Sequence, residues 1–293
     1  MLSSDRQKHF TAAPGEPQSF RPGVPAVCAR NLTAGYGKSV ASHPVIHGIS
    51  FNIAEGESAF LFGANGSGKT TLLRTLAGIL RYEGSLTLAG SELSTISRAR
   101  LGTCISMLTQ LSPVYFSYSV YDTILMGRYA RMRGPFHTVS REDEEMTERC
   151  LLATGLEDLR SRQISELSGG QLQRVFLART MAQDAPIMLL DEPMNHLDLK
   201  YQSQLMEYLD EWCRGSSVMP DGTVRRHTVI GVFHDIAAAL PLAGRRIFLK
   251  EGRILADLNE KDFPGADLLR EVYDTDVCSY MNRQLSVWNR ISR

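Results

Sequence analysis

Three features that would each assign a protein to a particular class are missing from the 293-residue sequence. No run approaches the roughly 20 apolar residues with which a helix crosses a bilayer. Lys plus Arg and Asp plus Glu both number 32, so no excess of positive charge indicates nucleic-acid binding. The five scattered cysteines form no C-x-x-C pair, which indicates free thiols rather than disulfides or a zinc site. A soluble, cytoplasmic protein is expected.

The beginning of the chain lacks the apolar segment of a signal peptide, and its Pro, Gly, Ser and charged residues predict a disordered leader over residues 1–25. From Ala26 onward, strand and helix patterns alternate, which predicts a mainly parallel sheet with helices on both faces. Helical periodicity without strand candidates predicts a helical insert at about 112–166. Residues 214–226 have the composition of an exposed flexible loop, and residues 277–288 are interpreted as a small hairpin turning at Asn282–Arg283.

A complete phosphate-loop motif, "GANGSGKT", lies between an apolar strand pattern and a helical one. Its glycines let the backbone curl so that N–H groups point at phosphate oxygens. Lys69 is placed to reach the β and γ phosphates, and the hydroxyl of Thr70 is a candidate Mg²⁺ ligand. The alternative is a glycine-rich turn that matches by chance. The residues assigned to nucleotide binding are Gly63, Ala64, Asn65, Gly66, Ser67, Gly68, Lys69, Thr70 and Thr71.

Two adjacent carboxylates, Asp191 and Glu192, end the apolar strand of "IMLLDEP". Ligands of open α/β sheets bind at this carboxyl edge. Because side chains alternate along a strand, the two acids need not share one role. Asp191 suits the coordination sphere of Mg²⁺, and Glu192 suits a base that takes a proton from the attacking water or holds that water in line. The alternative is a pair of solvated acids that start a turn.

A second glycine motif, "LSGGQ" at 167–171, opens the helix pattern "QLQRVFLARTMA". The start of a helix offers backbone N–H groups and the positive end of its dipole, which suits an anion. Gly169 and Gly170 leave these groups accessible, and Ser168 adds a hydroxyl. The alternative is a simple helix cap.

With these motifs in this order, residues 26–260 resemble the ATP-binding-cassette ATPases. The resemblance implies a P-loop NTPase (RecA-like) core of mainly parallel sheet, with a small antiparallel β region and the helical insert. It gives an ATPase domain at 26–262 and a C-terminal extension at 263–293. Tyr36 would stack on adenine, Gln110 would sense Mg²⁺ and the γ-phosphate, and His234 would contact the γ-phosphate.

The resemblance also implies that two copies pair head to tail around ATP. The phosphate loop of one copy and "LSGGQ" of the other would then hold each nucleotide, and hydrolysis would release the dimer. The residues assigned to this part of the site are Ser168, Gly169, Gly170, Gln171 and, in the loop "NHLD" at 195–198, Asp198. Ala64 and Met194 depart from common family residues without adding a charged group.

Within the family, "MGRY" at 126–129 and "LDLKYQ" at 197–202 are similar to the ATPase subunits of importers for iron–siderophore, haem and cobalamin. This likeness implies a peripheral subunit on the cytoplasmic face of the inner membrane, working with a separate permease and a substrate-binding protein, and not with nucleic acid. The alternatives are a soluble cassette ATPase of iron–sulfur assembly and an exporter subunit. One apolar segment would contact the permease or form the insert's own core, namely Tyr115, Phe116, Tyr118, Val120 and Tyr121.

Overall fold

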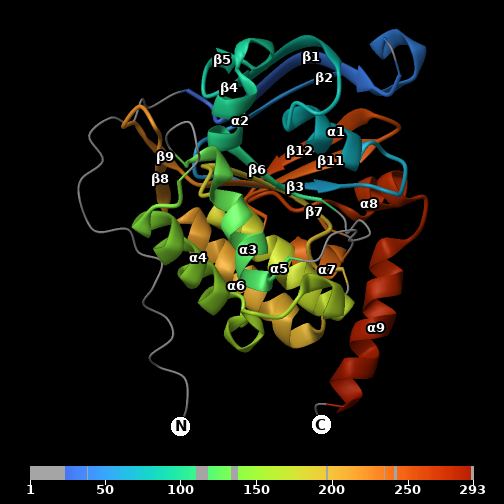
Figure 1. The fold of residues 1–293 in the computed structure, drawn as a ribbon. Helices are drawn as coiled ribbons and strands as arrows, with labels where there is room; N and C mark the ends of the chain where they lie inside the picture. The colour runs from blue at the N-terminus through green and yellow to red at the C-terminus, as the bar shows by residue number, and fades with distance from the viewer. Residues whose placement is uncertain are drawn as a thin grey trace.

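The computed structural model describes residues 24–37, 39–109, 118–132, 138–195, 197–233, 235–240 and 243–291. Two sheets form the body of the molecule, and helices cover the far side of the larger one (Figure 1). The larger sheet has the strand order β12 (Arg253–Asn259), β11 (Arg245–Lys250), β3 (Ser58–Phe62), β10 (Thr228–Val232), β7 (Ile187–Asp191), β6 (Ile105–Leu108). Its strands run parallel except for β12, which pairs antiparallel with β11 at one edge. The expected mainly parallel sheet is confirmed.

The smaller sheet is antiparallel, in the order β2 (Pro44–Ile53), β1 (Val27–Gly35), β4 (Tyr82–Leu88), β5 (Ser91–Glu92). Helix α1 (Lys69–Leu76) packs between the two sheets, because its leucines Leu72, Leu73 and Leu76 are buried in one core with residues of both. The second core lies on the opposite face of the larger sheet and is formed mainly with helices. Each face of the central sheet is therefore covered, as expected for parallel strands.

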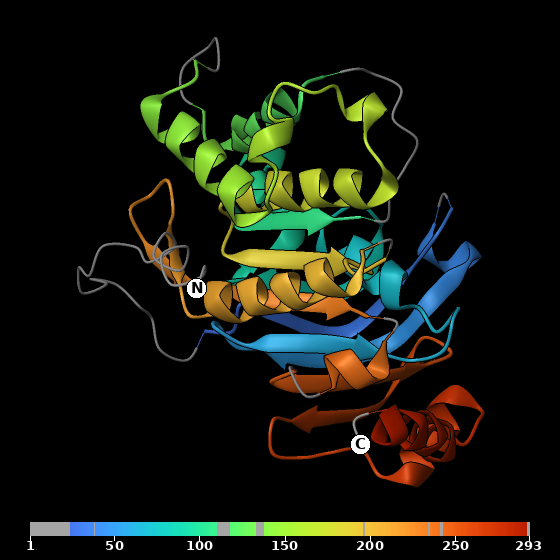
Figure 2. The same ribbon diagram turned by 90° about the horizontal axis from the view of Figure 1, so that it is seen from below.

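The remaining described helices lie between or after the strands of the two sheets. The α-helices are α2 (Arg98–Cys104), α3 (Val120–Leu125), α4 (Arg141–Ala153), α5 (Gly169–Ala182), α6 (Leu199–Cys213), α7 (Ile236–Ala239), α8 (Ala266–Tyr273) and α9 (Val277–Ile291). The 3₁₀ helices are η1 (Val40–Ser42), η2 (Leu93–Thr95), η3 (Met126–Ala130), η4 (Glu157–Leu159) and η5 (Ile164–Glu166). Between 118 and 166 the described residues form mainly helices and turns, and Ser119 forms an isolated β-bridge with Gln163. Figure 2 shows α3 and α4 at one end of the molecule and the C-terminal helices at the other. Within the described part of the chain, no helix is both long and apolar enough to cross a membrane.

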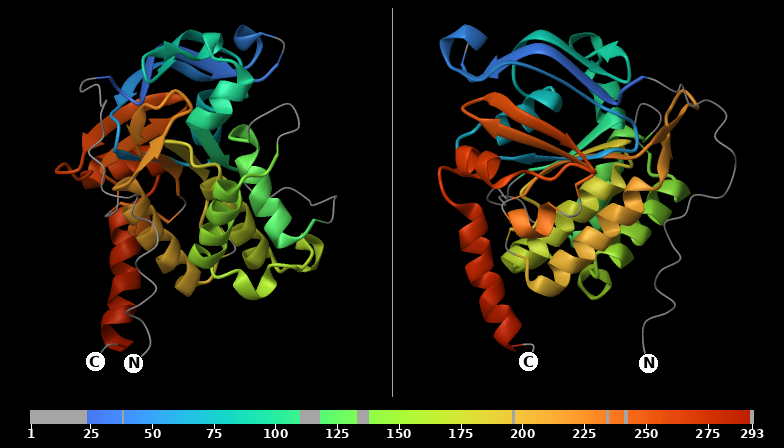
Figure 3. Two further views of the ribbon diagram at one scale, coloured as in Figure 1. Left: turned by 60° about the vertical axis from the view of Figure 1, so that its left-hand side comes forward. Right: turned by 180° about the vertical axis from the view of Figure 1, so that it is seen from behind.

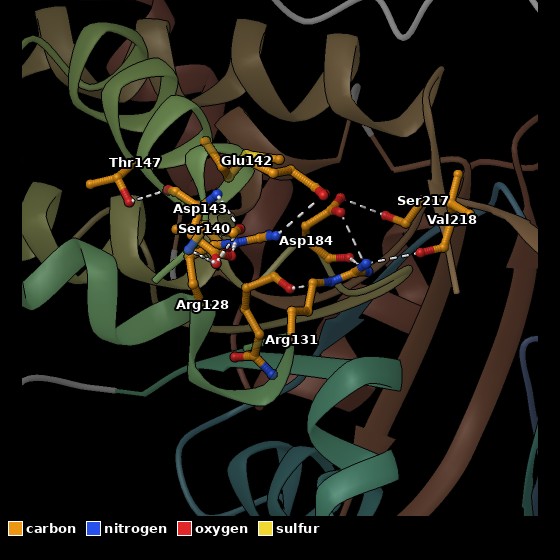
Figure 4. Close-up of polar contacts among 12 residues, drawn as sticks. Arg128, Arg131, Ser140, Glu142, Asp143, Thr147, Asp184, Ser217 and Val218 are labelled. Carbon is orange, nitrogen blue, oxygen red and sulfur yellow. Dashed lines mark hydrogen bonds and ion pairs between the residues drawn. The ribbon is translucent and has the colours of Figure 1, made fainter. Parts of the chain in front are cut away.

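Hydrogen bonds from two arginines connect the helical insert to the C-terminal end of α5 (Figure 4). Arg128 is buried and donates to a carboxylate oxygen of Asp143 at 2.8 Å and to the carbonyl of Ala182 at 2.9 Å. Arg131 donates to the carbonyl of Gln183 at 3.1 Å and pairs with Asp184. The last carbonyls of a helix have no N–H donors within it and lie at the negative end of its dipole, so cations that donate hydrogen bonds stabilise this end.

The close approach of η3 to α5 explains the glycine in "MGRY". A Cβ atom on Gly127 would lie 2.2 Å from the carbonyl oxygen of Arg179. A side chain at this position would push η3 away from α5 and separate Arg128 from its acceptors.

The interpretation of residues 214–226 as a flexible loop is wrong. Strands β8 (Ser216–Val218) and β9 (Val224–Arg226) pair antiparallel as a hairpin. Ser217 is buried, and its hydroxyl donates to Asp184 at 2.8 Å, while Arg131 donates to the carbonyl of Val218 at 2.8 Å. The Pro, Asp and Gly that suggested a loop occupy only the turn of this hairpin.

The expected hairpin at 277–288 is also wrong, because these residues form helix α9. Asp276 precedes the helix and accepts the backbone N–H of Ser279 at 3.0 Å, as an N-cap residue does. Val277 and Met281, one helical turn apart, pack on the core. Figure 3 shows the rest of α9 extending away from the sheets. The segment contains no Gly or Pro, so nothing interrupts the helix.

We expect Arg128→Met to lower the free energy of unfolding by about 3–5 kcal/mol, since it leaves the buried Asp143 without its cation. Burial opposes the charge of Asp143, but hydrogen bonds from Ser140 and the neighbouring Arg128 outweigh it and lower its pKa. Arg141→Met is the matched control: Arg141 pairs with Glu145 at 2.8 Å, but 90% of its side chain is exposed. That change should alter stability by at most about 0.5 kcal/mol. Equal urea midpoints for the two variants would contradict the role of the buried pair.

Candidate functional site

The phosphate loop connects β3 to α1 and depends on its glycines. Gly63 has φ 154° and Gly68 has φ 102°, in the region that favours glycine. A Cβ atom on Gly63 would lie 2.3 Å from the carbonyl oxygen of Leu249, and one on Gly68 would lie 2.7 Å from Ile46. At Gly63 and Gly68 the backbone therefore passes where no side chain fits, and the loop directs the start of α1 toward the carboxyl edge of the sheet.

Lys69 places its ammonium group inside the loop. Its Nζ donates to the carbonyls of Gly63 and Ala64, each at 2.8 Å. Burial lowers the pKa of Lys69, while Glu192 and Asp191 oppose this shift. The loop thus surrounds a cation whose acceptors in this structure are two backbone carbonyls of the loop and, at 3.4 Å, the hydroxyl of Ser67. Phosphate oxygens are stronger acceptors for such a group.

The hydroxyl of Thr70 and the carboxylate of Asp191 meet at the sheet edge. Thr70 Oγ1 donates to Asp191 Oδ1 at 2.9 Å. Asp191 is the last residue of β7 and is buried, which raises its pKa against the opposing effect of the Thr70 hydrogen bond. Two oxygen donors side by side, one of them a buried carboxylate, fit the preference of Mg²⁺ for oxygen ligands.

Glu192 follows the last residue of β7 and has a backbone conformation that differs from that of the strand. Its φ is 55°, in the left-handed region that non-glycine residues rarely adopt. The backbone N–H of Glu192 donates to the carbonyl of Val232 at 3.0 Å, and Asn195 Nδ2 donates to Glu192 Oε2 at 2.6 Å. The two adjacent acids are therefore held by different partners, in agreement with separate roles.

Residues 168–171 form the start of α5, and the structure shows a complete cap there. Ser168 Oγ accepts the N–H of Gln171 at 3.3 Å, and Gln171 Oε1 accepts the N–H of Ser168 at 3.0 Å. Ser168 and Gly169 are exposed. Each of these two side chains thus bonds to the backbone N–H of the other residue.

Gln173 is a site residue that the sequence analysis did not single out. It is buried in α5, and its Nε2 donates to the carbonyl of Pro193 at 3.2 Å, directly after the two acids. The only sequence signal for this link between α5 and the acidic strand end was a polar residue two positions after "SGGQ".

Asp198 directly precedes α6, and its carboxylate accepts the N–H of Tyr201 at 3.2 Å.

Tyr36 lies beside the start of α1. Its hydroxyl is 3.4 Å from Thr71 Oγ1, and 41% of the residue is exposed. Gln110 and His234, the other two residues assigned by resemblance, lie outside the described residues, as do Tyr115 and Phe116.

The described part of the aromatic segment 115–121 divides between core and surface. Val120 is fully buried in the insert, and Tyr121 packs on the same core with the guanidinium of Arg160 over its ring. Tyr118 is 46% exposed. Two of the three described residues therefore belong to the insert's own core, and Tyr118 is available for an outside contact.

Comparison with known proteins agrees with this arrangement. The sequence model described as ABC transporter matches residues 46–195. The ferric enterobactin transport ATP-binding protein FepC of Escherichia coli is 34% identical over 83% of this chain and 84% of its own length. A probable siderophore transport ATP-binding protein of Bacillus subtilis, YusV, is 32% identical over 86% of both chains. The chain spans 55% of another B. subtilis relative, the uncharacterized ABC transporter ATP-binding protein YvrA, which is 33% identical.

Solved structures show the same fold. The inward-facing structure of a metal-chelate type ABC transporter matches 85% of this chain and 88% of its own, with a TM-score of 0.67 and 25% identity. Two dimeric structures of a bacterial ABC transporter cassette, one of them bound to ADP and Pi, are 27% and 26% identical to this chain. Each has a TM-score of 0.67 and matches 81% of this chain and 100% of its own. The P-loop NTPase fold is confirmed. The chain belongs to the ABC transporter family, as a nucleotide-binding ATPase.

Proposed function

We propose that this chain is the ATP-hydrolysing subunit of an importer for an iron complex (siderophore or haem) or a cobalamin-like substrate. The observation that carries the catalytic part is the 2.9 Å hydrogen bond between Thr70 and Asp191, which joins the phosphate loop to the acidic strand end. The names of the relatives support the transport part, since they include siderophore, hydroxamate and hemin import proteins. In this proposal, residues 26–262 form the ATPase domain, 112–166 its helical insert and 263–293 an extension.

ATP would bind along the start of α1, with adenine on Tyr36. The N–H groups of the phosphate loop and the ammonium of Lys69 would hold the β and γ phosphates. A bound Mg²⁺, held by Thr70 and Asp191, would neutralise charge on these phosphates. Glu192 would hold the attacking water in line or take its proton, with its carboxylate oriented by Asn195. Gln110 and His234 would complete the contacts to Mg²⁺ and γ-phosphate.

A second copy of the chain would complete each site. The exposed start of α5 would present Ser168, Gly169 and Gly170 to the γ-phosphate bound by the partner copy. Asp198 would contribute from the loop before α6. The dimeric cassette structures among the structural relatives support this arrangement. Hydrolysis would remove the shared phosphate, so the two copies would separate.

The subunit would sit on the cytoplasmic face of the membrane, bound to a separate permease and served by a substrate-binding protein. The helical insert, with Tyr118 exposed, would contact the permease. Deleting the gene should abolish uptake of a labelled ferric siderophore or haem, and the intact gene should restore it. Purification with a soluble iron–sulfur scaffold and no membrane protein would contradict the proposal.

Glu192→Gln should keep ATP binding, because the amide retains the size of the side chain, while removing the group that activates water. Turnover should fall by at least about 100-fold. ATP should then hold the variant as a dimer in size-exclusion chromatography. A variant with normal turnover would rule out this role for Glu192.

Lys69→Ala removes the cation inside the phosphate loop. Because hydrogen bonds to charged groups contribute about 1.5–3 kcal/mol, ATP affinity should fall by about 10- to 150-fold in an equilibrium titration. The control is Lys261→Ala, since Lys261 is exposed and outside the site. Equal ATP affinity for both variants would contradict the binding role.

Tyr118→Asp tests the contact between insert and permease. A buried charge at an interface weakens association, so uptake in cells should fall by at least about tenfold while the ATPase activity of the isolated chain is kept. Leu255→Asp is the control, because Leu255 is also exposed but lies on β12, at the sheet edge away from the insert. If the two variants support the same uptake, Tyr118 has no part in the interface.

A further inference from the structure

The C-terminal extension touches the phosphate loop at its first residue. Tyr273, the last residue of α8, accepts the backbone N–H of Gly63 at its hydroxyl oxygen, at 3.1 Å. The two residues are 210 positions apart in the sequence. Burial raises the pKa of Tyr273 to about 12, so its hydroxyl remains neutral at physiological pH.

Helix α8 is itself bonded to β11, the strand next to β3, which leads into the loop. Leu269 and Val272 are buried, and Val272 packs in the same core as the sheet. Lys250, at the end of β11, donates to the carbonyl of Glu271 at 2.6 Å and pairs with Asp274 at 2.7 Å. A cation on the last carbonyls of α8 stabilises this end of the helix and holds Tyr273 in place.

The hairpin of β11 and β12 holds the other end of the same loop. At its turn, Glu251 and Gly252 both have positive φ, of 48° and 70°. Gly252 donates its N–H to the carbonyl of Ser67 at 3.1 Å. The loop is thus held by groups from outside it at Gly63 and at Ser67, and both come from the C-terminal part of the chain.

Gly63 is held on both sides in this structure, but the two contacts differ in kind. Lys69 binds its carbonyl, at 2.8 Å, with the same ammonium group that the phosphates would take. Tyr273 accepts the N–H of Gly63, which belongs to the peptide bond between β3 and the loop. If Lys69 turns to a nucleotide, the hydrogen bond from the N–H of Gly63 to Tyr273 can remain.

We propose that Tyr273 is a positioning residue for ATP binding, which keeps the first turn of the phosphate loop in the conformation that receives the phosphates. A loop that is already ordered loses less entropy on binding, so the effect appears in nucleotide affinity. This inference rests on the proposed role of the phosphate loop. It adds a function for the extension, which the family motifs do not include.

A cavity of about 700 Å³ lies beside this contact, between the phosphate loop and α9. Tyr273 and Tyr280 both line it. Tyr280 is 52% exposed, and its hydroxyl accepts from Gln284 at 2.8 Å instead of from the loop. The chain therefore contains a matched tyrosine at the same cavity with no bond to Gly63 in the described structure.

The test is the full-length Tyr273→Phe variant, compared with wild type and with Tyr280→Phe. Loss of one neutral hydrogen bond should raise the KM for ATP, and the Kd of a fluorescent ATP analogue, by about two- to twelve-fold. The kcat at saturating ATP should stay within about twofold, since the hydroxyl of Tyr273 bonds to the backbone of Gly63 and the proposal gives it no part in activating water. Tyr280→Phe should leave KM, Kd and kcat unchanged.

Three results would overturn the inference: an unchanged KM in Tyr273→Phe, even with a lowered melting temperature; an equal rise in KM in Tyr280→Phe; or a lowered kcat with an unchanged KM. The first would leave Tyr273 with a structural role only, and the last would place its hydroxyl in the chemical step. If Lys69→Ala loses ATP affinity while Tyr273→Phe does not, the inference fails and the ATPase function stands. If wild type binds no ATP, the function fails first.

Discussion

The nucleotide site depends on the register of three parallel strands. Leu61 of β3 pairs with Val232 of β10, and Val232 pairs with Asp191 of β7, so the three strands end side by side. Because the strands are parallel, the phosphate loop and the acidic turn leave the sheet at the same edge. A slip of one residue would move Asp191 by about 3.3 Å along its strand and turn it to the other face. The hydrogen bond from Thr70 to Asp191 could not form in that register.

Helix α5 joins this edge to the helical insert. Near its start, Gln173 binds the carbonyl of Pro193, and at its end Arg128 binds the carbonyl of Ala182. Both side chains are buried, so each bond is formed in a region of low dielectric, where its loss is most unfavourable. A displacement of the insert would therefore carry α5 with it and act on the turn after Glu192. In the proposed function, this path would link hydrolysis to a partner bound at the insert.

The sequence predicted the parts of the molecule that are local in the chain. Strand, loop and helix around residues 58–76 follow from an apolar run, glycines and helical spacing. One error and one omission concern long-range contacts, and a second error is local. The 214–226 hairpin is stabilised by Asp184 and Arg131, which no pattern within the hairpin reveals. The contact of Tyr273 with Gly63 likewise requires the tertiary fold, and the helix at 277–291 was missed because its cap, Asp276, precedes the segment considered.

The cap and the anion site at the start of α5 were treated as alternatives in the sequence, yet the structure makes them compatible. The capping box satisfies the N–H groups of Ser168 and Gln171. The first N–H groups of any helix have no acceptor within it, and here these groups belong to Gly169 and Gly170, which have no side chains to cover them. The box therefore fixes the direction of the helix start without using the amides of Gly169 and Gly170. A helix start that is rigid before an anion arrives binds it with less loss of entropy, which is why a cap strengthens the case for a phosphate supplied by another copy of the chain.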